Sequence, residues 1–306
     1  MRVAVLLPCF NEEPSIGAVV AGFGAALPDA VVYVYDNAST DRTAQVAAAA
    51  GAVVRSEPAQ GKGNVVRRMF ADVEADLYVM ADGDGTYDPA DAPGLIAALA
   101  DARADMAVGT RRDVTVDAGR SGHALGNRLF NRVYRWLFGE AFSDIFSGYR
   151  VFTRRFVKSF PAISTGFETE TEMSVHASRL HIPVVESEVS YGTRPDGSES
   201  KLRTYADGGR ILRKLLVLLK DNRPLFFYGV IGTAFLAAAL VLGVPVVVEF
   251  LRTGLVPRLP TFVLATGLTA LSGLSWMTGL ILYSVARSRT EHKRLVYLSQ
   301  PPPEWG

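Results

Sequence analysis

The sequence predicts an α/β fold in which a mostly parallel sheet carries helices on both faces, followed by two helices that cross a membrane. Continuous apolar runs at residues 3–7 and 31–35 are typical of strands buried on both faces. Each run is followed by a helix-forming segment, and this alternation is typical of parallel sheets. Two longer apolar stretches, at residues 225–248 and 261–286, have the length of a bilayer-spanning helix.

Two strand-helix units open the chain. In the first, residues 14–27 have helical spacing, and their apolar side is made of Ile16, Val19, Val20 and Phe23. In the second, the alanine-rich residues 44–50 favour a helix. A third and a fourth strand follow at residues 53–54 and 77–81. Ligands of parallel sheets bind beyond the carboxyl ends of the strands, so we expect the functional site there.

The composition limits the possible partners and the compartment. The 306 residues are 49% hydrophobic with a mean hydropathy of +0.17, and the apolar excess is concentrated in the two long stretches. The net charge of +1 favours neither nucleic acid nor an acidic partner. A single cysteine, Cys9, excludes an internal disulfide framework and fits a reducing compartment. The first ten residues are too short in apolar length, and too soon interrupted by Pro8, to predict a signal peptide.

The acidic motif Asp82-Gly83-Asp84 follows the fourth strand. Residues two apart in an extended chain point to the same side, so the two carboxylates are expected to stand together. Paired oxygen ligands suit Mg²⁺ or Mn²⁺, which keep coordination positions for substrate phosphates. The same residue types are also common in any turn after a strand, and that simpler interpretation stays open at this point.

Polar clusters follow the other strands as well, at residues 8–13, 36–43 and 60–64. None has the glycine spacing of a dinucleotide-binding or Walker-type phosphate loop. The acidic motif also fits the nucleophile of haloacid-dehalogenase-like phosphatases, with Asp82 as the nucleophile. That fold needs a later acidic pair, which the sequence lacks in a suitable context, and its motif normally opens the chain.

Eight motifs occur in an order that resembles the family 2 glycosyltransferases, specifically the polyprenyl-phosphate sugar synthases related to dolichyl-phosphate mannose synthase. They cover nearly the whole chain and lie at residues 7–12, 36–41, 61–63, 82–84, 109–111, 144–150, 166–170 and 194–201. Two positions depart from the family pattern. Phe10 replaces the usual Tyr, and residues 85–87 replace the Leu-Gln that often follows the acidic pair, which leaves the sugar and the base unassigned.

The resemblance implies a GT-A type fold that binds a nucleotide sugar, UDP- or GDP-linked. In the donor half it implies that Asp82 and Asp84 hold Mg²⁺ or Mn²⁺, and that Asp36 accepts a hydrogen bond from the base. The nucleoside pocket is then lined by Pro8, Asn11 and Glu12, and phosphate charge is neutralised by Lys62 and Arg111. From the residues alone, Asp36 also fits a turn or helix cap, and the two cations also fit an ordinary charged surface.

In the acceptor half, the resemblance places Asp144 in the position proposed as the catalytic base. A phosphate monoester has a second pKa of about 6 and has mostly lost its protons at pH 7, so we expect Asp144 mainly to orient a cation, with Arg150 the first candidate, or to take the proton only from the minority monoanion. A plain structural role in the loop is the alternative. The residues expected to hold the acceptor phosphate are Arg150, Arg194, Lys201 and Arg203. Glu168 and Glu170 are expected to shape the acceptor side, or else to be solvated surface.

The membrane end predicts the domain organisation. Both long apolar stretches lack charge, and basic residues flank their outer ends, so the positive-inside rule places both termini and the catalytic domain in the cytoplasm, at the inner membrane. The predicted parts are a glycosyltransferase domain (residues 1–202), an interfacial helix (203–224), a two-helix transmembrane region (225–286) and a cytoplasmic tail (287–306). The alternatives are a buried helical hairpin of a soluble domain and an amphipathic helix docked on that domain.

The combined prediction is an inverting, metal-dependent transfer of a sugar to a polyprenyl phosphate. Small residues in the second span permit close helix packing, and the resemblance implies a homo-oligomer, a tetramer in bacterial members. The alternatives are another lipid or glycan acceptor, a processive polysaccharide synthase, for which the chain has too few spans, and a non-catalytic membrane scaffold.

Overall fold

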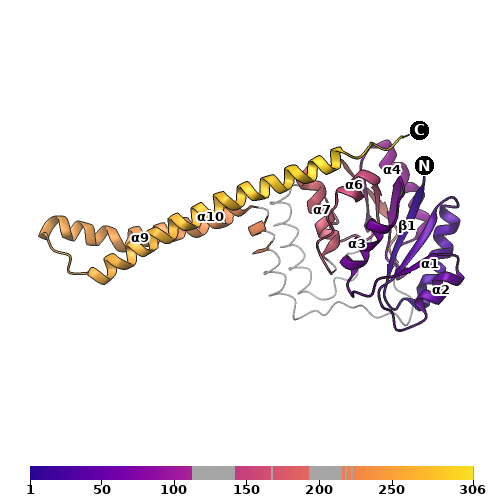
Figure 1. Cartoon of the computed structure of the whole chain (residues 1–306), viewed down its shortest axis with the longest axis horizontal. Helices are drawn as coiled ribbons and strands as arrows, with labels where there is room; N and C mark the ends of the chain where they lie inside the picture. The colour runs from indigo at the N-terminus through magenta and orange to yellow at the C-terminus, as the bar shows by residue number, and fades with distance from the viewer. Residues whose placement is uncertain (112–141, 167, 193–215, 218, 222, 306) are drawn as a thin grey trace. The chain divides into compact units, whose positions relative to one another are not determined.

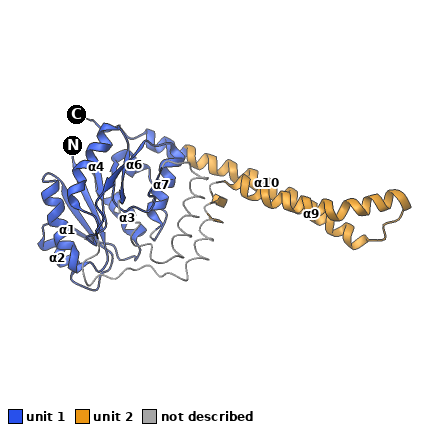
Figure 2. Ribbon diagram, turned by 180° about the vertical axis from the view of Figure 1, so that it is seen from behind, with its two compact units in different colours: residues 1–203, 292–306 blue, residues 204–291 orange. Residues whose placement is uncertain are grey.

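The structure, a computed structural model, describes residues 1–111, 142–166, 168–192, 216–217, 219–221 and 223–305 (Figure 1). The chain divides into two compact units (Figure 2). Unit 1 contains residues 1–203 and 292–306, and unit 2 contains residues 204–291. Residues 292–306 therefore belong to the unit that carries the sheet, whereas the sequence predicts a separate tail from residue 287 onward.

The described part of unit 1 contains a seven-stranded sheet with strand order β3-β2-β1-β4-β6-β5-β7. The strands are β1 (Val3–Cys9), β2 (Val31–Asp36), β3 (Val53–Ser56), β4 (Leu77–Met80), β5 (Met106–Arg111), β6 (Arg150–Thr153) and β7 (Val184–Val189). Strand β6 is antiparallel to both of its neighbours, and the other pairs are parallel. The prediction of a mostly parallel α/β sheet is confirmed.

Helices cover both faces of this sheet. One face carries α1 (Glu13–Ala26), α2 (Thr43–Ala49), the short helix η1 (Pro89–Asp91) and α4 (Ala92–Asp101); the other carries α3 (Lys62–Asp72), α6 (Arg154–Ser159) and α7 (Thr169–Leu180). Successive side chains along each strand point to opposite faces of the sheet, so each face has its own hydrophobic core. On the first face, Val5 and Leu7 pack with Phe23 of α1. On the second, the Phe70 ring of α3 lies 6.3 Å from Tyr78 and 5.8 Å from Phe152.

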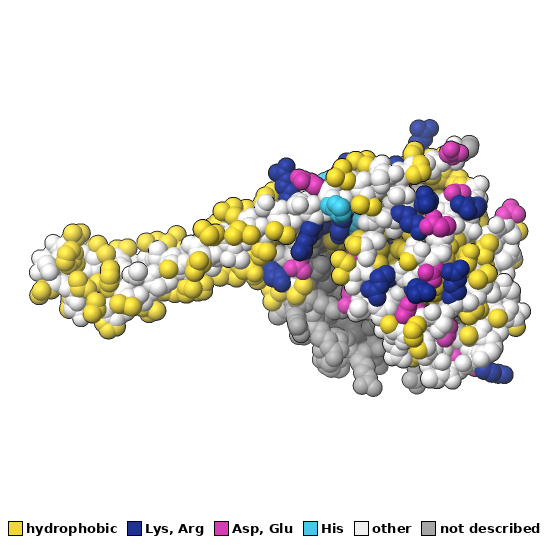
Figure 3. All heavy atoms as spheres, in the orientation of Figure 1, with side chains coloured by type: hydrophobic (Ala, Val, Ile, Leu, Met, Phe, Trp, Pro, Cys, Tyr) yellow, Lys and Arg dark blue, Asp and Glu magenta, His cyan; other side chains and the backbone are white. Residues whose placement is uncertain are grey.

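The second unit contains helix α9 (Pro224–Thr253) and most of helix α10 (Leu259–Leu298). Both are long and apolar enough to cross a membrane. Only 17% of the most apolar stretch of α9 and 11% of that of α10 is buried, whereas the core helix of a soluble protein is mostly buried. In Figure 3, hydrophobic side chains are spread along the visible face of unit 2, and charged side chains are seen mainly on unit 1.

Small residues line the contact between α9 and α10. The buried positions recur every seven residues in both helices, as in coiled coils, and include Gly232, Ala239 and Val246 in α9 and Ala265, Ser272 and Gly279 in α10. A Cβ atom on Gly232 would lie 2.7 Å from Cδ1 of Trp276, so only glycine permits this approach. These small residues therefore serve the hairpin itself, and the oligomer stays a prediction.

The predicted interfacial helix at residues 203–224 lies mostly outside the described residues. Within it, Leu216 and Val217 are helical and exposed.

The C-terminal segment of the chain makes contacts with the sheet unit. Tyr297 Oη donates to Oδ2 of the fully buried Asp105 (2.5 Å), and Oδ1 of Asp105 accepts from Arg155 Nε (2.7 Å). Trp305 packs against the core of the first sheet face. The C-terminal segment 292–306 is thus docked on the sheet unit.

Candidate functional site

The carboxyl ends of β1, β2 and β4 meet at one edge of the sheet, because these three strands are parallel neighbours. Hydrogen bonds tie the following loops together. Asn11 N donates to Ser39 Oγ (2.9 Å), and Thr40 N donates to Asn11 Oδ1 (2.8 Å). Ser15 Oγ donates to Gly83 O (2.8 Å). The polar clusters that the sequence predicts after these strands are therefore brought together.

The loop after β1 supplies the predicted donor residues Pro8, Asn11 and Glu12. Asn11 adopts a positive φ of 54°, a conformation that Asn tolerates better than most residues. Glu12 is buried, and its backbone N–H donates to Thr43 Oγ1 (2.8 Å). Pro8 is half-buried within β1. These contacts fix the shape of the loop against the loop that follows β2.

Asp36 ends β2 and has an unsatisfied buried acceptor. Its Oδ2 atom accepts from Ser39 N (3.3 Å), as in a turn, while Oδ1 is buried and has no hydrogen-bond partner among the described residues. Buried acceptors are almost always paired, so an orphaned one at a loop edge fits a bound donor group. The two interpretations of Asp36 from the sequence, turn residue and base acceptor, are therefore compatible.

The acidic pair lies just beyond β4. Asp84 is buried, and its Oδ1 accepts from Thr86 Oγ1 (2.7 Å) and Thr86 N (3.1 Å), which fixes the carboxylate. The Asp82 side chain is 30% exposed. A Cβ atom on Gly148 would lie 2.7 Å from Asp82 Oδ2, so the glycine lets this carboxylate pass close to the loop before β6.

Negative charge is concentrated around this edge. Burial raises the pKa of the Cys9 thiol well above its ordinary value, and the carboxylates of Glu12, Asp82, Asp36 and Asp84 raise it further. Among the described residues, no three His, Cys, Asp or Glu side chains are grouped as a complete metal site. Two carboxylates with further positions left for substrate phosphates are what Mg²⁺ and Mn²⁺ commonly use, so this donor set fits such an ion.

Lys62 begins helix α3 and lies between two carboxylates. Its Nζ atom forms ion pairs with Asp82 Oδ1 and with Glu170 Oε1, the latter at 2.5 Å. Burial by itself lowers the pKa of Lys62, but the two carboxylates outweigh it and raise the pKa above its ordinary value, so the ammonium stays charged. The predicted donor residue Lys62 and the predicted acceptor-side residue Glu170 are therefore in direct contact.

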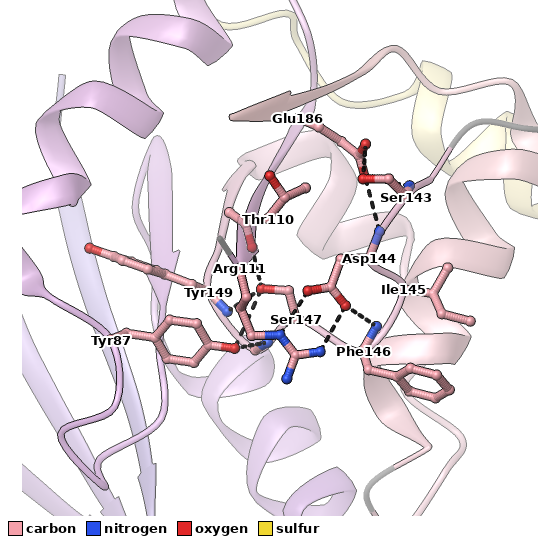
Figure 4. Close-up of polar contacts among 12 residues, drawn as sticks. Tyr87, Thr110, Arg111, Ser143, Asp144, Ile145, Phe146, Ser147, Tyr149 and Glu186 are labelled. Atoms are coloured by element: carbon pink, nitrogen blue, oxygen red, sulfur yellow. Dashed lines mark hydrogen bonds and ion pairs between the residues drawn. The ribbon is translucent and has the colours of Figure 1, made fainter. Parts of the chain in front are cut away.

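Asp144 and Arg111 form a two-pronged salt bridge (Figure 4). Arg111 Nε donates to Oδ2 (2.7 Å) and Nη2 donates to Oδ1 (2.8 Å). The guanidinium carbon also lies 5.3 Å from the centre of the Tyr191 ring. Burial lowers the pKa of Arg111, but the hydrogen bonds to Asp144 outweigh it and raise the pKa. The two hydrogen bonds show that the cation that Asp144 orients is Arg111, and the expectation of Arg150 as the first candidate was wrong.

Arg150 has a different place. It is fully buried and donates to Ile145 O (2.8 Å), Ser147 O (2.9 Å) and Ser174 Oγ (3.0 Å). A guanidinium with no exposed surface that is bonded to the surrounding backbone shapes the loop before β6. The structure thus corrects the predicted contact between Arg150 and the acceptor phosphate, because the side chain does not reach the surface of the site.

The remaining predicted acceptor residues are only partly described. Glu168 is half-buried at the start of α7, and Glu170 is buried two residues further on, so it is not solvated surface. The other three predicted phosphate ligands, Arg194, Lys201 and Arg203, lie outside the described residues.

Two tyrosines that the sequence did not single out connect the halves of the site. Tyr87 Oη accepts from Gly148 N (2.9 Å) and lies 3.5 Å from Ser147 Oγ. Its ring stands 5.2 Å from the Tyr191 ring. Burial raises the pKa of Tyr87 to about 12, and Asp82 adds to this, so the hydroxyl stays protonated. The only sequence signal was its position three residues after Asp84.

A sequence model described as "Glycosyl transferase family 2" matches residues 4–160 of this chain. Glycosyltransferase AglJ of Haloferax volcanii is 36% identical over 250 residues, which are 81% of this chain and 82% of that protein. A dolichyl-phosphate hexose transferase of the same organism is 25% identical over 222 residues, 72% of this chain and 95% of that protein.

The fold is similar to that of glucosyl-3-phosphoglycerate synthase from Mycobacterium tuberculosis, solved with Mn²⁺, UDP-glucose and phosphoglyceric acid. The TM-score is 0.56 at 22% identity, over 72% of this chain and 79% of that one. This likeness supports the GT-A type fold that the sequence predicts.

Proposed function

Because the chain belongs to glycosyl transferase family 2, we propose that it transfers a sugar from a UDP- or GDP-linked donor to the phosphate of a polyprenyl lipid at a membrane. The observation that carries the proposal is the meeting of Asp36, Asp82 and Asp84 at one edge of the sheet, in a chain with two candidate membrane-spanning helices.

In the donor half, each side chain has a distinct role. The orphaned Oδ1 of Asp36 accepts an N–H of the nucleobase, and the loop from Pro8 to Glu12 lines the nucleoside pocket. Asp82 and Asp84 hold Mg²⁺ or Mn²⁺, and a bound ion of this kind supplies positive charge to the departing diphosphate. The Mn²⁺ and UDP-glucose in glucosyl-3-phosphoglycerate synthase support this assignment and make UDP-glucose the first donor to assay.

In the acceptor half, a phosphate oxygen of the lipid attacks the anomeric carbon on the side opposite the nucleoside diphosphate. The new C–O bond forms as the bond to the diphosphate breaks, so the product is a polyprenyl-phosphate sugar with inverted configuration. About nine-tenths of the acceptor is a dianion at pH 7 and needs no general base. Arg111, held by Asp144, supplies fixed positive charge beside the reacting groups. Arg194, Lys201 and Arg203 remain proposed ligands of the acceptor phosphate.

The lipid acceptor is supported by two observations. The α9–α10 hairpin would keep the enzyme at the membrane where such a lipid lies. The similar dolichyl-phosphate hexose transferase has dolichyl phosphate, a polyprenyl phosphate, in its name.

The test is an assay of the purified full chain with labelled UDP- and GDP-sugars, a polyprenyl phosphate and Mn²⁺ or Mg²⁺. We expect a lipid-linked sugar that EDTA abolishes. The variant Asp84→Asn should lose at least about a hundredfold in turnover, since it removes charge that stabilises the leaving group. Asp88→Asn is the matched control, because Asp88 lies in the same loop but caps η1 through Ala90 N (2.9 Å).

Two results would count against the proposal. If folded Asp84→Asn retains more than about a tenth of wild-type turnover at saturating metal, the metal assignment fails. If sugar is transferred to a soluble glycan or another lipid but never to a polyprenyl phosphate, the acceptor assignment fails while the family assignment stands.

A further inference from the structure

Lys62 occupies a position that the donor-binding role leaves unexplained. Its side chain is only 10% exposed and is bonded to carboxylates from two separate elements, Asp82 after β4 and Glu170 in α7. A lysine kept only to meet a diphosphate would need one exposed ammonium, and no buried partner on a distant helix. The second carboxylate is therefore the feature to be explained.

The geometry shows which carboxylate oxygen of Asp82 is bound by Lys62. The Oδ2 atom of Asp82 faces Gly148, closely enough that a Cβ there would lie 2.7 Å away. The Oδ1 atom points to the ammonium of Lys62. The same Cβ position would lie 3.3 Å from Oδ1, so Oδ1 has more room than Oδ2 for a metal ion, and it is the oxygen that the lysine holds.

The charges of the cluster lead to the same point. As carboxylates, Asp82, Asp84 and Glu170 carry three negative charges against the one positive charge of Lys62, which leaves two negative charges in a partly buried region. A divalent cation balances this remainder. When no metal ion is bound, the Lys62 ammonium balances the charge of Asp82.

We infer that Lys62 is a resident counter-cation that a divalent metal ion displaces from Asp82, and that Glu170 is the carboxylate that keeps Lys62 paired after this exchange. The inference rests on the proposed metal-binding role of Asp82 and Asp84. Without Glu170, the displaced ammonium would be left buried and unpaired, which is costly, so it would compete more strongly for Asp82. Glu170 is therefore a positioning residue that acts on the metal through Lys62.

The exchange links the two halves of the site. Metal binding transfers Lys62 wholly to Glu170, at the N-terminal turn of α7, where the acceptor side is expected. The ion pair between α3 and α7 then tightens when the donor's metal arrives. This would favour binding of the metal and donor before the acceptor.

The test measures Mn²⁺ affinity of the full-length protein in detergent, by electron paramagnetic resonance of free Mn²⁺, with and without UDP or GDP. Lys62→Met should bind Mn²⁺ about tenfold more tightly than wild type, because the competing charge is gone. Glu170→Gln should bind Mn²⁺ about tenfold more weakly. In the double variant, Glu170→Gln should add little to Lys62→Met, since its effect passes through the lysine.

The matched control is Lys158→Met. Lys158 is also partly buried and paired with a carboxylate, Glu74 (2.7 Å), but the pair lies outside the site, so Mn²⁺ affinity should not change. Melting temperatures confirm that each variant folds. If Lys62→Met does not fold, Lys62→Gln replaces it, because the amide removes the charge and keeps hydrogen-bond donors.

The outcomes separate this inference from the proposed function. If wild type binds no Mn²⁺ with or without nucleotide, the proposed metal site fails, and the exchange with it. If wild type binds Mn²⁺ but Lys62→Met does not bind it more tightly, only the exchange is overturned. It is likewise overturned if Glu170→Gln weakens binding equally with and without Lys62, because Glu170 would then act by its own charge.

Discussion

At the scale of single residues, the position of Arg111 depends on Asp144. Two hydrogen bonds of 2.7 and 2.8 Å hold the planar guanidinium, and the Tyr191 ring lies against it at 5.3 Å. A guanidinium held by two hydrogen bonds keeps a fixed position and orientation, whereas the side chain of a lysine is flexible. Under the proposed function, Asp144 would therefore act on the reaction by holding Arg111.

This role predicts coupled effects on turnover. Arg111→Met and Asp144→Asn should each lower turnover by about tenfold to a hundredfold, less than Asp84→Asn, and the double variant should be no worse than the poorer single one. Arg55→Met is the matched control, because Arg55 also pairs with an aspartate, Asp72, and stacks on Tyr33, but at the opposite end of the sheet order.

A base role for Asp144 would give another result. The deficit of Asp144→Asn would then shrink between pH 6 and pH 8, as the acceptor phosphate loses its last proton, while that of Arg111→Met would not follow it. Rates measured across this range decide between the two roles.

The sequence could identify these residues, but it could not pair them. The position of Asp82 and Asp84 just beyond β4 could be predicted, because the apolar run of the strand and the two aspartates are adjacent in sequence. The partners of Lys62 and Asp144 come from distant elements, and no local pattern connects Lys62 with Glu170. Arg150 was misjudged because arginine is rarely fully buried, and its acceptors, such as Ser174, become neighbours only in the folded chain.

At the scale of elements, β1 to β4, α1, α2 and the two long apolar helices were predicted from the sequence, and the direction of β6 was not. The apolar runs predict buried strands, but β6 has only four residues, and so short a run does not show that it pairs antiparallel with β4 and β5. The consequence for the site is direct: β6 brings the loop that holds Asp144 and Gly148 next to the loop after β4.

Helices α6 and α7 hold a histidine that should make folding sensitive to pH. His176 is buried between the rings of Phe156 (5.4 Å) and Phe160 (5.5 Å), and its Nε2 lies 3.1 Å from Ser159 Oγ. Burial lowers the pKa of His176 to about 3, and Lys293 adds to the effect. The folded protein therefore keeps this side chain neutral.

The sign of the pH effect follows from proton binding. Below about pH 6.5 the unfolded chain binds a proton at this histidine, whereas the folded chain does so only near pH 3, so stability falls as pH drops through that window. Between pH 7 and pH 5 we expect a loss of about 2 kcal/mol, or about 4–8 °C in melting temperature.

Thermal unfolding between pH 7 and pH 5 checks the prediction. The quantity to compare between proteins is the slope of melting temperature against pH, not the melting temperature itself. His176→Gln should flatten the dependence of melting temperature on pH, and the exposed His292→Gln should leave it unchanged. An equal slope in all three proteins would show that the buried histidine is not responsible.

At the scale of the whole molecule, the first unit is discontinuous in sequence. Its C-terminal segment 292–306 supplies Tyr297 to the buried Asp105, and Trp305 to the core. A chain that ends at residue 203 lacks these contacts and should therefore be less stable than the same unit in the full-length protein. Its melting temperature should rise when a synthetic peptide of residues 292–306 is added.

The peptide offers its own control. A version with Tyr297→Phe keeps the ring but loses the hydrogen bond to a buried carboxylate, which is worth about 1.5–3 kcal/mol, so it should bind about tenfold more weakly or worse. Calorimetric titration measures both peptides. Equal affinities would mean that the contact with Asp105 contributes nothing to docking.

The same discontinuity bears on membrane topology. One folded unit lies on one side of a membrane, so the segments before α9 and after α10 should share a side, which the positive-inside rule predicts to be the cytoplasm. An impermeant maleimide added to intact cells should label Leu255→Cys, between the helices, and label Glu304→Cys only after lysis. The buried native Cys9 should not react. Labelling of Leu255→Cys only after lysis would contradict this topology.

The link between Asp105 and Tyr297 also sets an order of events during synthesis. The two residues are 192 positions apart, so at about 5–20 residues per second the ribosome delivers the tyrosine about 10–40 s after the aspartate. Until then the sheet unit has an incompletely paired carboxylate in its interior, and the apolar hairpin must be made first. The catalytic unit thus reaches full stability only after the membrane helices have been translated, so a chain that stalls before them stays exposed to proteolysis.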